Sequence, residues 1–310
     1  MQKRSPILVT GANGLVGTAL VSQLAAEGFT NVMPMTRLDC DLMNPQRVRD
    51  LFKHYRPEYV FHTAARVYGI LGNMHKQGES YYENTMINTN VVDACIKGGV
   101  RKITAIGTGA VYPANPKSLP MREDEIFEGR PHPSESGYAH AKRGMLAMLE
   151  AYAESYGLDW AYVVSCNLFG PHDRFQPVTG HVVPSLISKF SKALDDGGLV
   201  HVWGDGSAQR DFLYVKDAAR AITTIMRGPT GAVNMGGGTV WSIREIVEML
   251  SAISGVDRII WDPTKPNGQD YRAYDLSRLT AAGFTREYMI DEGLQETWEW
   301  YRGKGNLSHR

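Results

Sequence analysis

Residues 7–17 read ILVTGANGLVG, and they give the first strong indication of the architecture. An apolar, β-branched run comes first, as in a buried strand, and glycines at 11, 14 and 17 follow before a helical pattern begins. In this context Gly11 permits a tight turn, Gly14 lets backbone N–H groups approach a pyrophosphate, and Gly17 allows close packing of helix on strand. The stretch predicts a dinucleotide-binding loop, although an ordinary glycine-rich turn can share this spacing.

Strand-like runs alternate with helical patterns on the C-terminal side of this loop. Helices are expected near 15–27, 45–54, 81–97 and 137–156, and strands near 31–35, 58–64, 102–108 and 160–166. Continuous β-branched runs separated by helices indicate a parallel sheet covered on both faces. We therefore predict an α/β fold, a Rossmann-type doubly wound parallel sheet with a smaller C-terminal α/β substrate lobe.

The alternation weakens after Gly170. Residues 171–184 have a loop-like composition, a helical run follows, and residues 201–222 look like a strand, a turn and a return to the sheet. The two lobes are therefore expected to be interleaved. We assign an NADP-binding Rossmann domain and a substrate-binding lobe, the first over 1–170 and completed by about 210–236, the second over 171–209 and 237–310.

Composition narrows the class of protein. Of the 310 residues, 43% are hydrophobic and 21% are charged, as in ordinary globular domains. The 33 Lys and Arg balance the 33 Asp and Glu, so no overall field favours nucleic acid or an acidic membrane. No apolar run is long enough to span a membrane and no signal-peptide pattern occurs, so we expect a cytoplasmic protein. The three cysteines and the histidines show no CxxC or HExxH spacing, which argues against disulfides and against a metal.

The end of the second predicted strand bears on the choice of cofactor. An acidic residue there would bind the ribose 2′-hydroxyl of NAD, whereas the sequence has Thr36 and Arg37, which favours the 2′-phosphate of NADPH. The alternative for Arg37 is a solvated surface charge, and Asn13 stands where some NADP-dependent proteins have a basic residue. The candidate cofactor-binding residues are Gly11, Asn13, Gly14, Leu15, Val16, Gly17, Arg37, Asp41, Leu42, Ala64, Ala65 and Lys142.

Tyr138 and Lys142 form the pattern that carries chemistry. At positions i and i+4 they share one helix face, and an ammonium beside a phenol lowers the pKa of that phenol. Such a pair can protonate a carbonyl oxygen as hydride arrives, with Lys142 also holding the cofactor ribose. Thr108, at a strand end about 30 residues upstream, is expected to hydrogen-bond the same oxygen. The alternative is a solvent-exposed pair. Asn84 is expected to support the cofactor side, or to be a helix N-cap.

These residues together resemble the extended short-chain dehydrogenase/reductases. The resemblance spans nearly the whole chain and narrows to the GDP-L-fucose synthase branch through six segments: AARVYGILGN (64–73), IGTGAVYP (106–113), NLFGPHDRF (167–175), GHVVP (180–184), VWGDGSAQRDFLYVKD (202–217) and KPNGQDYR (265–272). Members of that branch epimerise GDP-linked 4-keto-6-deoxy sugars at C3 and C5 and then reduce C4 with NADPH. The resemblance therefore implies an NADPH-dependent enzyme with a GDP-sugar substrate.

The chain departs from that branch at one position. A cysteine and a histidine exchange protons during epimerisation in the branch; the histidine corresponds to His181, but the cysteine corresponds to Ala110. Related dehydratases place Asp and Glu after the active-site Thr, where this chain has Gly109 and Ala110. The resemblance thus implies reduction of C4 without efficient 3,5-epimerisation, as in reductases of bacterial GDP-6-deoxy-heptose pathways that supply capsule or lipopolysaccharide. Cys166 is interpreted as a small buried side chain rather than a replacement proton donor.

The resemblance also implies substrate contacts and an assembly. Residues 67–72 are expected to form a loop over the sugar, where Tyr68 selects the ring substituent, and helices near 83–97 and 137–156 are expected to pair in a homodimer. The alternative for Trp203 is a core position, the alternative for Arg210 is an ion pair with Asp211, and the alternative for His181 is a surface role. The candidate substrate-binding residues are Tyr112, Asn167, His181, Trp203, Arg210 and Arg272.

Two other functions stay open from the sequence. One is a bifunctional GDP-L-fucose synthase in which another group replaces the missing cysteine. The other is a non-catalytic Rossmann protein that senses the redox state of NADP. Such sensors usually lose the tyrosine or the lysine of the catalytic pair, and this chain keeps both Tyr138 and Lys142.

Overall fold

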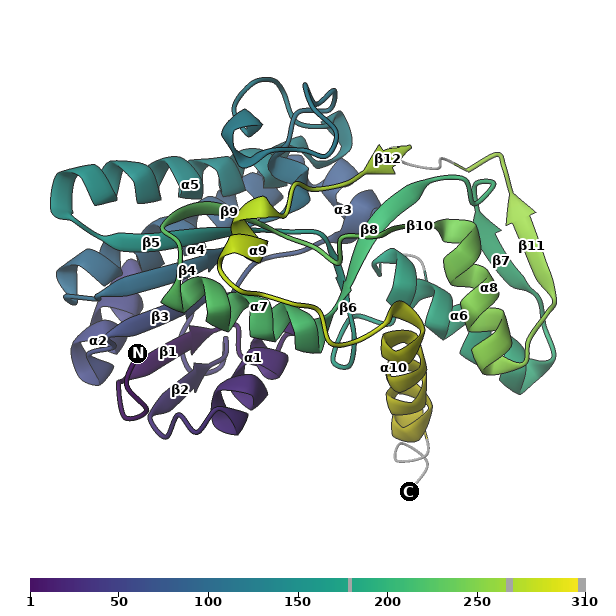
Figure 1. Ribbon diagram of the computed structural model, residues 1–310, viewed down its shortest axis with the longest axis horizontal. Coiled ribbons are helices and arrows are strands. Elements are labelled where there is room, and N and C mark those ends of the chain that lie inside the picture. Colours follow the sequence, from purple (N-terminus) through teal and green to yellow (C-terminus); the bar gives the residue numbers. More distant parts are fainter. Residues whose placement is uncertain (178–179, 266–269, 306–310) are drawn as a thin grey trace.

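A six-stranded parallel sheet forms the centre of the larger lobe in the computed structural model, which describes residues 1–177, 180–265 and 270–305 (Figure 1). The strand order is β2-β1-β3-β4-β5-β9, and every neighbouring pair is parallel. This confirms the doubly wound sheet. The strands are β1 (Ile7–Thr10), β2 (Val32–Met35), β3 (Tyr59–His62), β4 (Lys102–Ile106), β5 (Asp159–Ser165) and β9 (Gly231–Met235).

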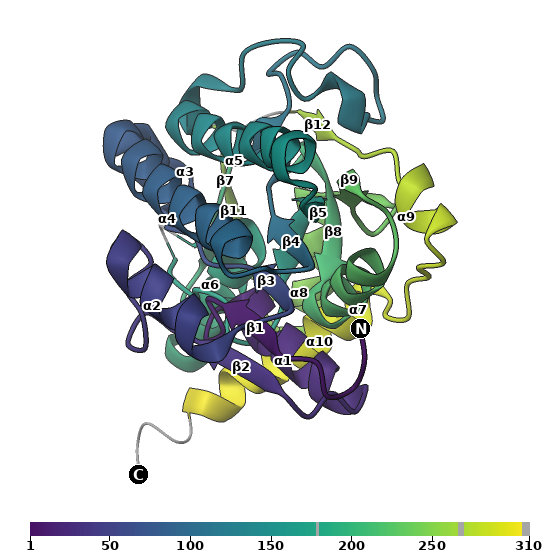
Figure 2. The same cartoon turned by 90° about the vertical axis from the view of Figure 1, so that its left-hand side faces the viewer.

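Helices cover both faces of this sheet, which explains why most of its strands are apolar throughout rather than alternating. Figures 1 and 2 show α1 and α7 on one face and α2, α4 and α5 on the other. The helix bounds are α1 (Leu15–Ala26), α7 (Val215–Arg227), α2 (Pro45–Tyr55), α4 (Gln77–Lys97) and α5 (Ser136–Tyr156).

The smaller lobe has its own hydrophobic core, which includes Phe190, Val202, Phe212 and Leu250. Figure 1 shows it beside the carboxyl-terminal ends of the parallel strands. Its elements are β6 (Asn167–Phe169), α6 (Val182–Asp196), β7 (Val200–Trp203), β8 (Gln209–Tyr214), β10 (Val240–Ser242), α8 (Ile243–Ser254), β11 (Ile259–Asp262), β12 (Tyr271–Arg272) and α10 (Ile290–Gly305).

One expectation about chain topology is wrong. The sequence predicted that the run over 201–222 returns to the parallel sheet, but β8 pairs with β6, β10 and β12 in a second sheet. The edge of β5 is instead taken by β9, which follows α7 and completes the six-stranded sheet. The exact lobe boundaries given above stay a prediction.

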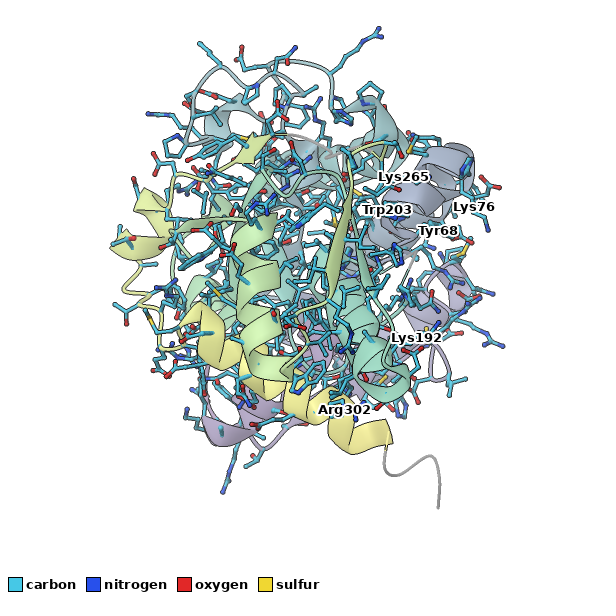
Figure 3. All side chains as sticks on the ribbon, turned by 90° about the vertical axis from the view of Figure 1, so that its right-hand side faces the viewer. Tyr68, Lys76, Lys192, Trp203, Lys265 and Arg302 are labelled. Carbon is cyan, nitrogen blue, oxygen red and sulfur yellow. The ribbon has the colours of Figure 1, made fainter. Side chains whose placement is uncertain are left out.

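A second correction concerns residues 67–72, which were expected to form a loop. Gly69–His75 is helical and is labelled α3. The hydroxyl of Tyr68, immediately before α3, donates to Glu83 of α4 at 2.5 Å, and the Lys76 ammonium lies 5.4 Å from the centre of the Tyr68 ring (Figure 3). These contacts fold the segment back on α4.

The order of the strands predicts where a ligand binds. The chain moves from β1 to β2 on one side and then crosses to β3 on the other, so the loops after β1 and β3 diverge. Open α/β sheets bind ligands in the crevice at such a switch point, beyond the carboxyl ends of the strands. In the part of the chain that the structure describes, no helix combines the length and the apolarity needed to cross a bilayer.

Candidate active site

The loop between β1 and α1 has the geometry that its glycines predicted. Gly11 has φ of +69°, and a Cβ on it would come within 2.8 Å of the Ala64 backbone after β3. A Cβ on Gly17 would lie 2.2 Å from the Gly11 carbonyl oxygen, so only glycine lets α1 pack this closely on the loop. Both positions therefore exclude a side chain for a physical reason.

The first turn of α1 fits the pyrophosphate of a dinucleotide. Gly14 is the N-cap residue, and no side chain caps the helix, so its first-turn N–H groups and the positive end of the helix dipole are available to an anion. Asn13 is exposed at this turn, and Leu15 and Val16 are half-buried. The glycine-rich loop and the uncapped N-terminus of α1 together suit a bound dinucleotide.

The turn after β2 presents a cation rather than a carboxylate. Arg37 is exposed, whereas the carboxylate of Asp39 accepts hydrogen bonds from the Thr36 N–H and hydroxyl at 2.8 and 2.7 Å. These bonds lower the pKa of Asp39, and they occupy the only carboxylate in this turn. The arrangement agrees with the preference for a 2′-phosphate that the sequence indicated.

The loops that flank this crevice are held by buried amides of α4. Asn84 accepts from the Arg66 N–H at 2.9 Å and donates to the Arg66 carbonyl at 3.0 Å, just after Ala64 and Ala65. Asn84 therefore fixes the backbone at Arg66 and is not a helix N-cap, because α4 begins at Gln77; its support of the cofactor side stays a prediction. A second amide, from Asn90, donates to the carbonyl of Leu42, and Asp41 accepts from the Met43 N–H.

Thr108, Tyr138 and Lys142 come together where β4 ends. Lys142 donates to the Ile106 carbonyl at 2.8 Å, and its ammonium lies 5.9 Å from the centre of the Tyr138 ring. The Thr108 oxygen accepts from the Ala110 N–H at 3.2 Å, which caps the short 3-10 helix η1 (Gly109–Val111) and leaves the hydroxyl proton for another acceptor. The catalytic roles of these residues stay a prediction.

Burial controls the protonation of this pair. Lys142 is only 1% exposed, and desolvation lowers its pKa to about 7. Desolvation also raises the pKa of Tyr138, to which the charge of Glu135 adds. The expected lowering of the Tyr138 pKa by Lys142 stays a prediction, because in the protein alone the loss of water around the phenol dominates and the Lys142 ammonium is itself partly neutral. Tyr138 is a protonated phenol at neutral pH.

A buried hydrogen-bonded chain connects the phosphate loop to the catalytic helix. The Thr10 hydroxyl and the Nδ1 atom of His62 are 2.8 Å apart, and Nε2 of His62 is 3.2 Å from the Asn88 amide oxygen. The Asn88 amide donates in turn to the Ala141 carbonyl, next to Lys142. Burial and the nearby Lys142 lower the pKa of His62 to about 3, so the ring is neutral. Since Asn88 offers an oxygen, Nε2 carries the proton and Nδ1 accepts from Thr10.

Two arginines lie side by side in the second sheet. Arg210 of β8 lies opposite Arg272 of β12 in the parallel register. Burial, together with Arg272, lowers the pKa of Arg210 to about 10. The Arg210 guanidinium donates to the Gln209 carbonyl, not to Asp211, whose carboxylate accepts instead from the backbone of Gly237. The ion-pair alternative for Arg210 is therefore excluded, and two adjacent cations suit a pyrophosphate.

The other candidate substrate residues are spread more widely. Asn167 is the first residue of β6 and is half-buried. Trp203, at the end of β7, is 36% exposed, so it is not a core residue, and the Lys189 ammonium lies 5.6 Å from its ring (Figure 3). His181 is the N-cap residue of α6, with its Nδ1 3.8 Å from the Asp173 carboxylate, which raises the pKa of His181.

Tyr112 is placed differently from the rest. It is 3% exposed, and its hydroxyl donates to the Asn234 amide oxygen at 2.7 Å, inside the lobe. A contact between Tyr112 and the substrate stays a prediction, and this geometry gives it no support.

The Cys166 thiol hydrogen-bonds to the Asp211 carboxylate, and burial raises the pKa of Cys166, so Cys166 is a neutral buried thiol.

Sequence reasoning missed three residues of the site. His62 and Glu135 belong to no recognisable motif. His62 hydrogen-bonds to Thr10 of β1 and to Asn88 of α4. The negative charge of Glu135 acts to raise the pKa values of Tyr138, His181 and Arg210. Tyr274 was also missed. It follows Arg272 by two positions, which places the two side chains on one side of an extended segment, and this period was the available signal.

Comparisons with known proteins agree with this geometry. The family described as NAD dependent epimerase/dehydratase matches residues 7–236. A probable GDP-L-fucose synthase 1 from Oryza sativa subsp. japonica is 36% identical over 305 residues, covering 96% of this chain and 92% of that protein. The GDP-L-fucose synthase of Escherichia coli (strain K12) is 32% identical over 308 residues, covering 95% and 96%.

Solved structures with the same fold include two enzymes from Campylobacter jejuni. A GDP-6-OMe-4-keto-L-xylo-heptose reductase has a TM-score of 0.91 at 28% identity, covering 98% of this chain and 99% of the other. A GDP-mannoheptose C4 reductase solved with NADP bound has a TM-score of 0.87 at 30% identity, covering 97% and 99%. The fold, the glycine-rich loop before α1 and the relatives together define an NADP-dependent oxidoreductase of the extended short-chain dehydrogenase/reductase class. Within that class, the chain belongs to the NAD dependent epimerase/dehydratase family, in its GDP-L-fucose synthase branch.

Proposed function

We propose that this protein reduces the C4 keto group of a GDP-linked 4-keto-6-deoxy sugar, with a heptose favoured over a hexose, and does so without efficient 3,5-epimerisation. NADPH supplies the hydride to C4 when it is bound. The observation that carries the proposal is Ala110, a 3% exposed methyl two residues after Thr108, where the branch has a proton-exchanging cysteine.

The chain's own residues provide the proton that reduction requires. Tyr138 is held as a neutral phenol by burial, so it can donate its proton to the C4 oxygen as negative charge develops there. The Thr108 oxygen accepts from the Ala110 N–H through one lone pair, so the Thr108 hydroxyl proton can be donated to the C4 oxygen. Lys142, fixed by the Ile106 carbonyl, is positioned behind the phenol to stabilise the anion that remains.

Epimerisation needs an acid and a base on opposite faces of the sugar, and this chain offers an incomplete set. Ala110 has no exchangeable proton. The Cys166 thiol is engaged by Asp211 and has a raised pKa, which makes it a poor base. His181 beside Asp173 is the remaining group, and one group cannot serve both faces. Preference for a heptose is supported by the two Campylobacter jejuni neighbours, whose names describe heptose reductases.

The test is product analysis with purified protein, NADPH and two substrates, GDP-4-keto-6-deoxymannose and the corresponding heptose, in deuterated water. We expect NADPH oxidation with retention of configuration at C3 and C5 and no deuterium at either carbon. The matched variant Ala110→Cys is expected to introduce deuterium at C3 or C5. The proposal would be overturned if the wild type converted the hexose to GDP-L-fucose as fast as it oxidised NADPH.

A second candidate is a bifunctional 3,5-epimerase-4-reductase. It is favoured by one observation, the 36% and 32% identity to proteins named GDP-L-fucose synthases over nearly the whole chain. In that case the deuterium experiment gives labelled C3 and C5 with the wild type, and His181→Gln abolishes the label while reduction of an already epimerised substrate continues.

We also propose that the protein acts as a homodimer through α4 and α5. These helices pack against each other on one face of the sheet (Figure 2), and both carry exposed aromatic residues. Tyr81 and Tyr82 of α4 are 48% and 59% exposed, and Tyr156 of α5 is 63% exposed. Exposed aromatic residues on paired helices are typical of a protein interface.

A further inference from the structure

Gly109, the residue after Thr108, lies in contact with a side chain from a distant part of the chain. An ideal Cβ on Gly109 would be 2.0 Å from the hydroxyl oxygen of Tyr274 and 2.9 Å from its Cζ atom. The tyrosine hydroxyl therefore occupies the space that a side chain at position 109 would fill. Any residue larger than glycine would displace Tyr274.

The backbone holds Tyr274 in this position. The segment is hydrogen-bonded to Met121 on both sides, since the Met121 N–H donates to the Ala273 carbonyl and the Asp275 N–H donates to the Met121 carbonyl, both at 2.9 Å. The Tyr274 ring packs on the Tyr112 ring, with centres 6.1 Å apart. Tyr274 is 5% exposed, so its ring is fixed in the lobe and only its hydroxyl end reaches Gly109.

The two packed tyrosines differ in what their hydroxyls do. The Tyr112 hydroxyl donates to Asn234. Within residues 1–177, 180–265 and 270–305, the Tyr274 hydroxyl has no hydrogen-bond partner. The ring is buried, but its hydroxyl oxygen is not among the enclosed side-chain atoms that lack a partner, so this oxygen is open to a group from outside the chain.

The charges around the Tyr274 hydroxyl indicate which partner. The charges of Arg272 and Arg210, the pair suited to the pyrophosphate, act on the Tyr274 hydroxyl, as do Cys166 and Asp211. Its contact with Gly109 places it next to Thr108 in the chain. The hydroxyl is therefore near both the residue expected to contact the C4 oxygen and the cations expected to contact the pyrophosphate, and the group that connects those two parts of the substrate is the sugar.

We propose that Tyr274 is a specificity-determining residue whose hydroxyl binds a hydroxyl group of the substrate sugar, and that Gly109 is glycine to admit it. This inference rests on the proposed function, because it uses the same GDP-sugar and the same cleft. A site built around a buried phenol discriminates strongly against a sugar that lacks the matching hydroxyl, because the phenol is then left unpaired.

The experiment measures kcat/KM for Tyr274→Phe with three GDP-linked substrates, the 4-keto-6-deoxyhexose, the 4-keto-3,6-dideoxyhexose and the 4-keto-6-deoxyheptose. The variant keeps the ring packing and removes only the hydroxyl. We expect a loss of about tenfold or more for substrates that carry the contacted hydroxyl and less than about threefold for the one that lacks it. Comparing kcat/KM for the heptose with that for the hexose tests an exocyclic hydroxyl. Comparing kcat/KM for the dideoxyhexose with that for the hexose tests the C3 hydroxyl.

Tyr301→Phe is the matched control, since it removes a tyrosine hydroxyl of the smaller lobe that Ser188 already engages. It is expected to lower thermal stability and to leave the ratios of kcat/KM among the substrates unchanged. Gly109→Ala is expected to reproduce the substrate pattern of Tyr274→Phe, and to have a smaller effect when the hydroxyl is already gone. The affinity for NADPH, measured by fluorescence, is expected to stay constant in all variants.

The outcomes separate this inference from the function beneath it. If the wild type reduces none of the three sugars, the proposed function fails and the inference fails with it. If the wild type reduces C4 but Tyr274→Phe changes all three kcat/KM values equally, or not at all, only the inference is overturned. A change that tracks lost thermal stability, as in Tyr301→Phe, also overturns it.

Discussion

A lysine with 1% exposure and a backbone carbonyl as its hydrogen-bond acceptor is an unusual residue in a folded protein. Desolvation of Lys142 destabilises the free enzyme, and the same desolvation lowers the pKa of Lys142 to about 7. A bound cofactor whose ribose hydroxyls accept from this ammonium would relieve part of the cost. The site is therefore less stable empty than filled, which is typical of functional sites.

Lys142→Met is expected to stabilise the free protein at neutral pH. The unfolded chain holds the lysine proton up to about pH 10.5, whereas the folded chain releases it near pH 7, so between these values the unfolded state binds more protons and wild-type stability rises with pH. The advantage of the variant is thus largest below about pH 7, at about 3–5 kcal/mol, and disappears near pH 10.5. Urea unfolding of both proteins across this range measures the difference, and a difference that does not depend on pH would contradict the assignment.

Arg37→Glu is expected to reverse the cofactor preference. The substitution removes the exposed cation after β2 and adds a carboxylate that repels a 2′-phosphate and accepts from a 2′-hydroxyl, while Asp39 stays occupied by Thr36. We expect KM for NADPH to rise by about tenfold or more and KM for NADH to fall. Arg49→Glu, an exposed site on α2, is the control. Equal changes for both cofactors would show that Arg37 does not contact the phosphate.

At the scale of elements, the loop between β1 and α1 shows how backbone contacts shape a site. Gly17→Ala places a methyl carbon 2.2 Å from the Gly11 carbonyl oxygen, so α1 must move away from β1. We expect a loss of about 1–3 kcal/mol in unfolding free energy and a weaker affinity for NADPH. Thermal unfolding and cofactor titration measure the two effects.

Gly144→Ala in α5 is the matched comparison for that substitution. A Cβ at Gly144 has no atom within 4 Å, and the residue is exposed within a helix. Alanine there is expected to increase stability by about 0.5–1 kcal/mol and to leave NADPH binding unchanged. A loss of stability at both glycines would mean that close packing is not the cause at Gly17.

Most elements of the larger lobe could be predicted because each carries a local pattern. The strands β1, β3, β4 and β5 are continuous apolar or β-branched runs, and α1, α4 and α5 follow them with helical periodicity. The partner of β8 could not be predicted, since strand pairing depends on which edges remain free after β9 has joined β5. For α3, two glycines and a short length concealed a helix that its contacts with neighbouring elements stabilise.

At the scale of the whole molecule, the proposed dimer can be disrupted from one helix. Tyr82→Asp adds a charge to the exposed aromatic face of α4, and burying that charge against a second subunit would cost several kcal/mol. We expect the mass measured by light scattering to fall from dimer to monomer, with an unchanged circular dichroism spectrum. Leu199→Asp, at a position of the smaller lobe that is 49% exposed, is expected to keep the dimer. A wild-type monomer would refute the assembly.

The sequence by itself determined the class of fold, the cofactor loop and the Tyr138–Lys142 pair, because each of these depends on residues close together in the chain with a fixed spacing. Tertiary structure decided the rest. It set the protonation of Tyr138 and Lys142, since desolvation depends on all the surrounding atoms. It also brought Tyr274 onto Gly109, a contact across 165 positions that no local pattern records, because packing alone determines which distant side chains share a space.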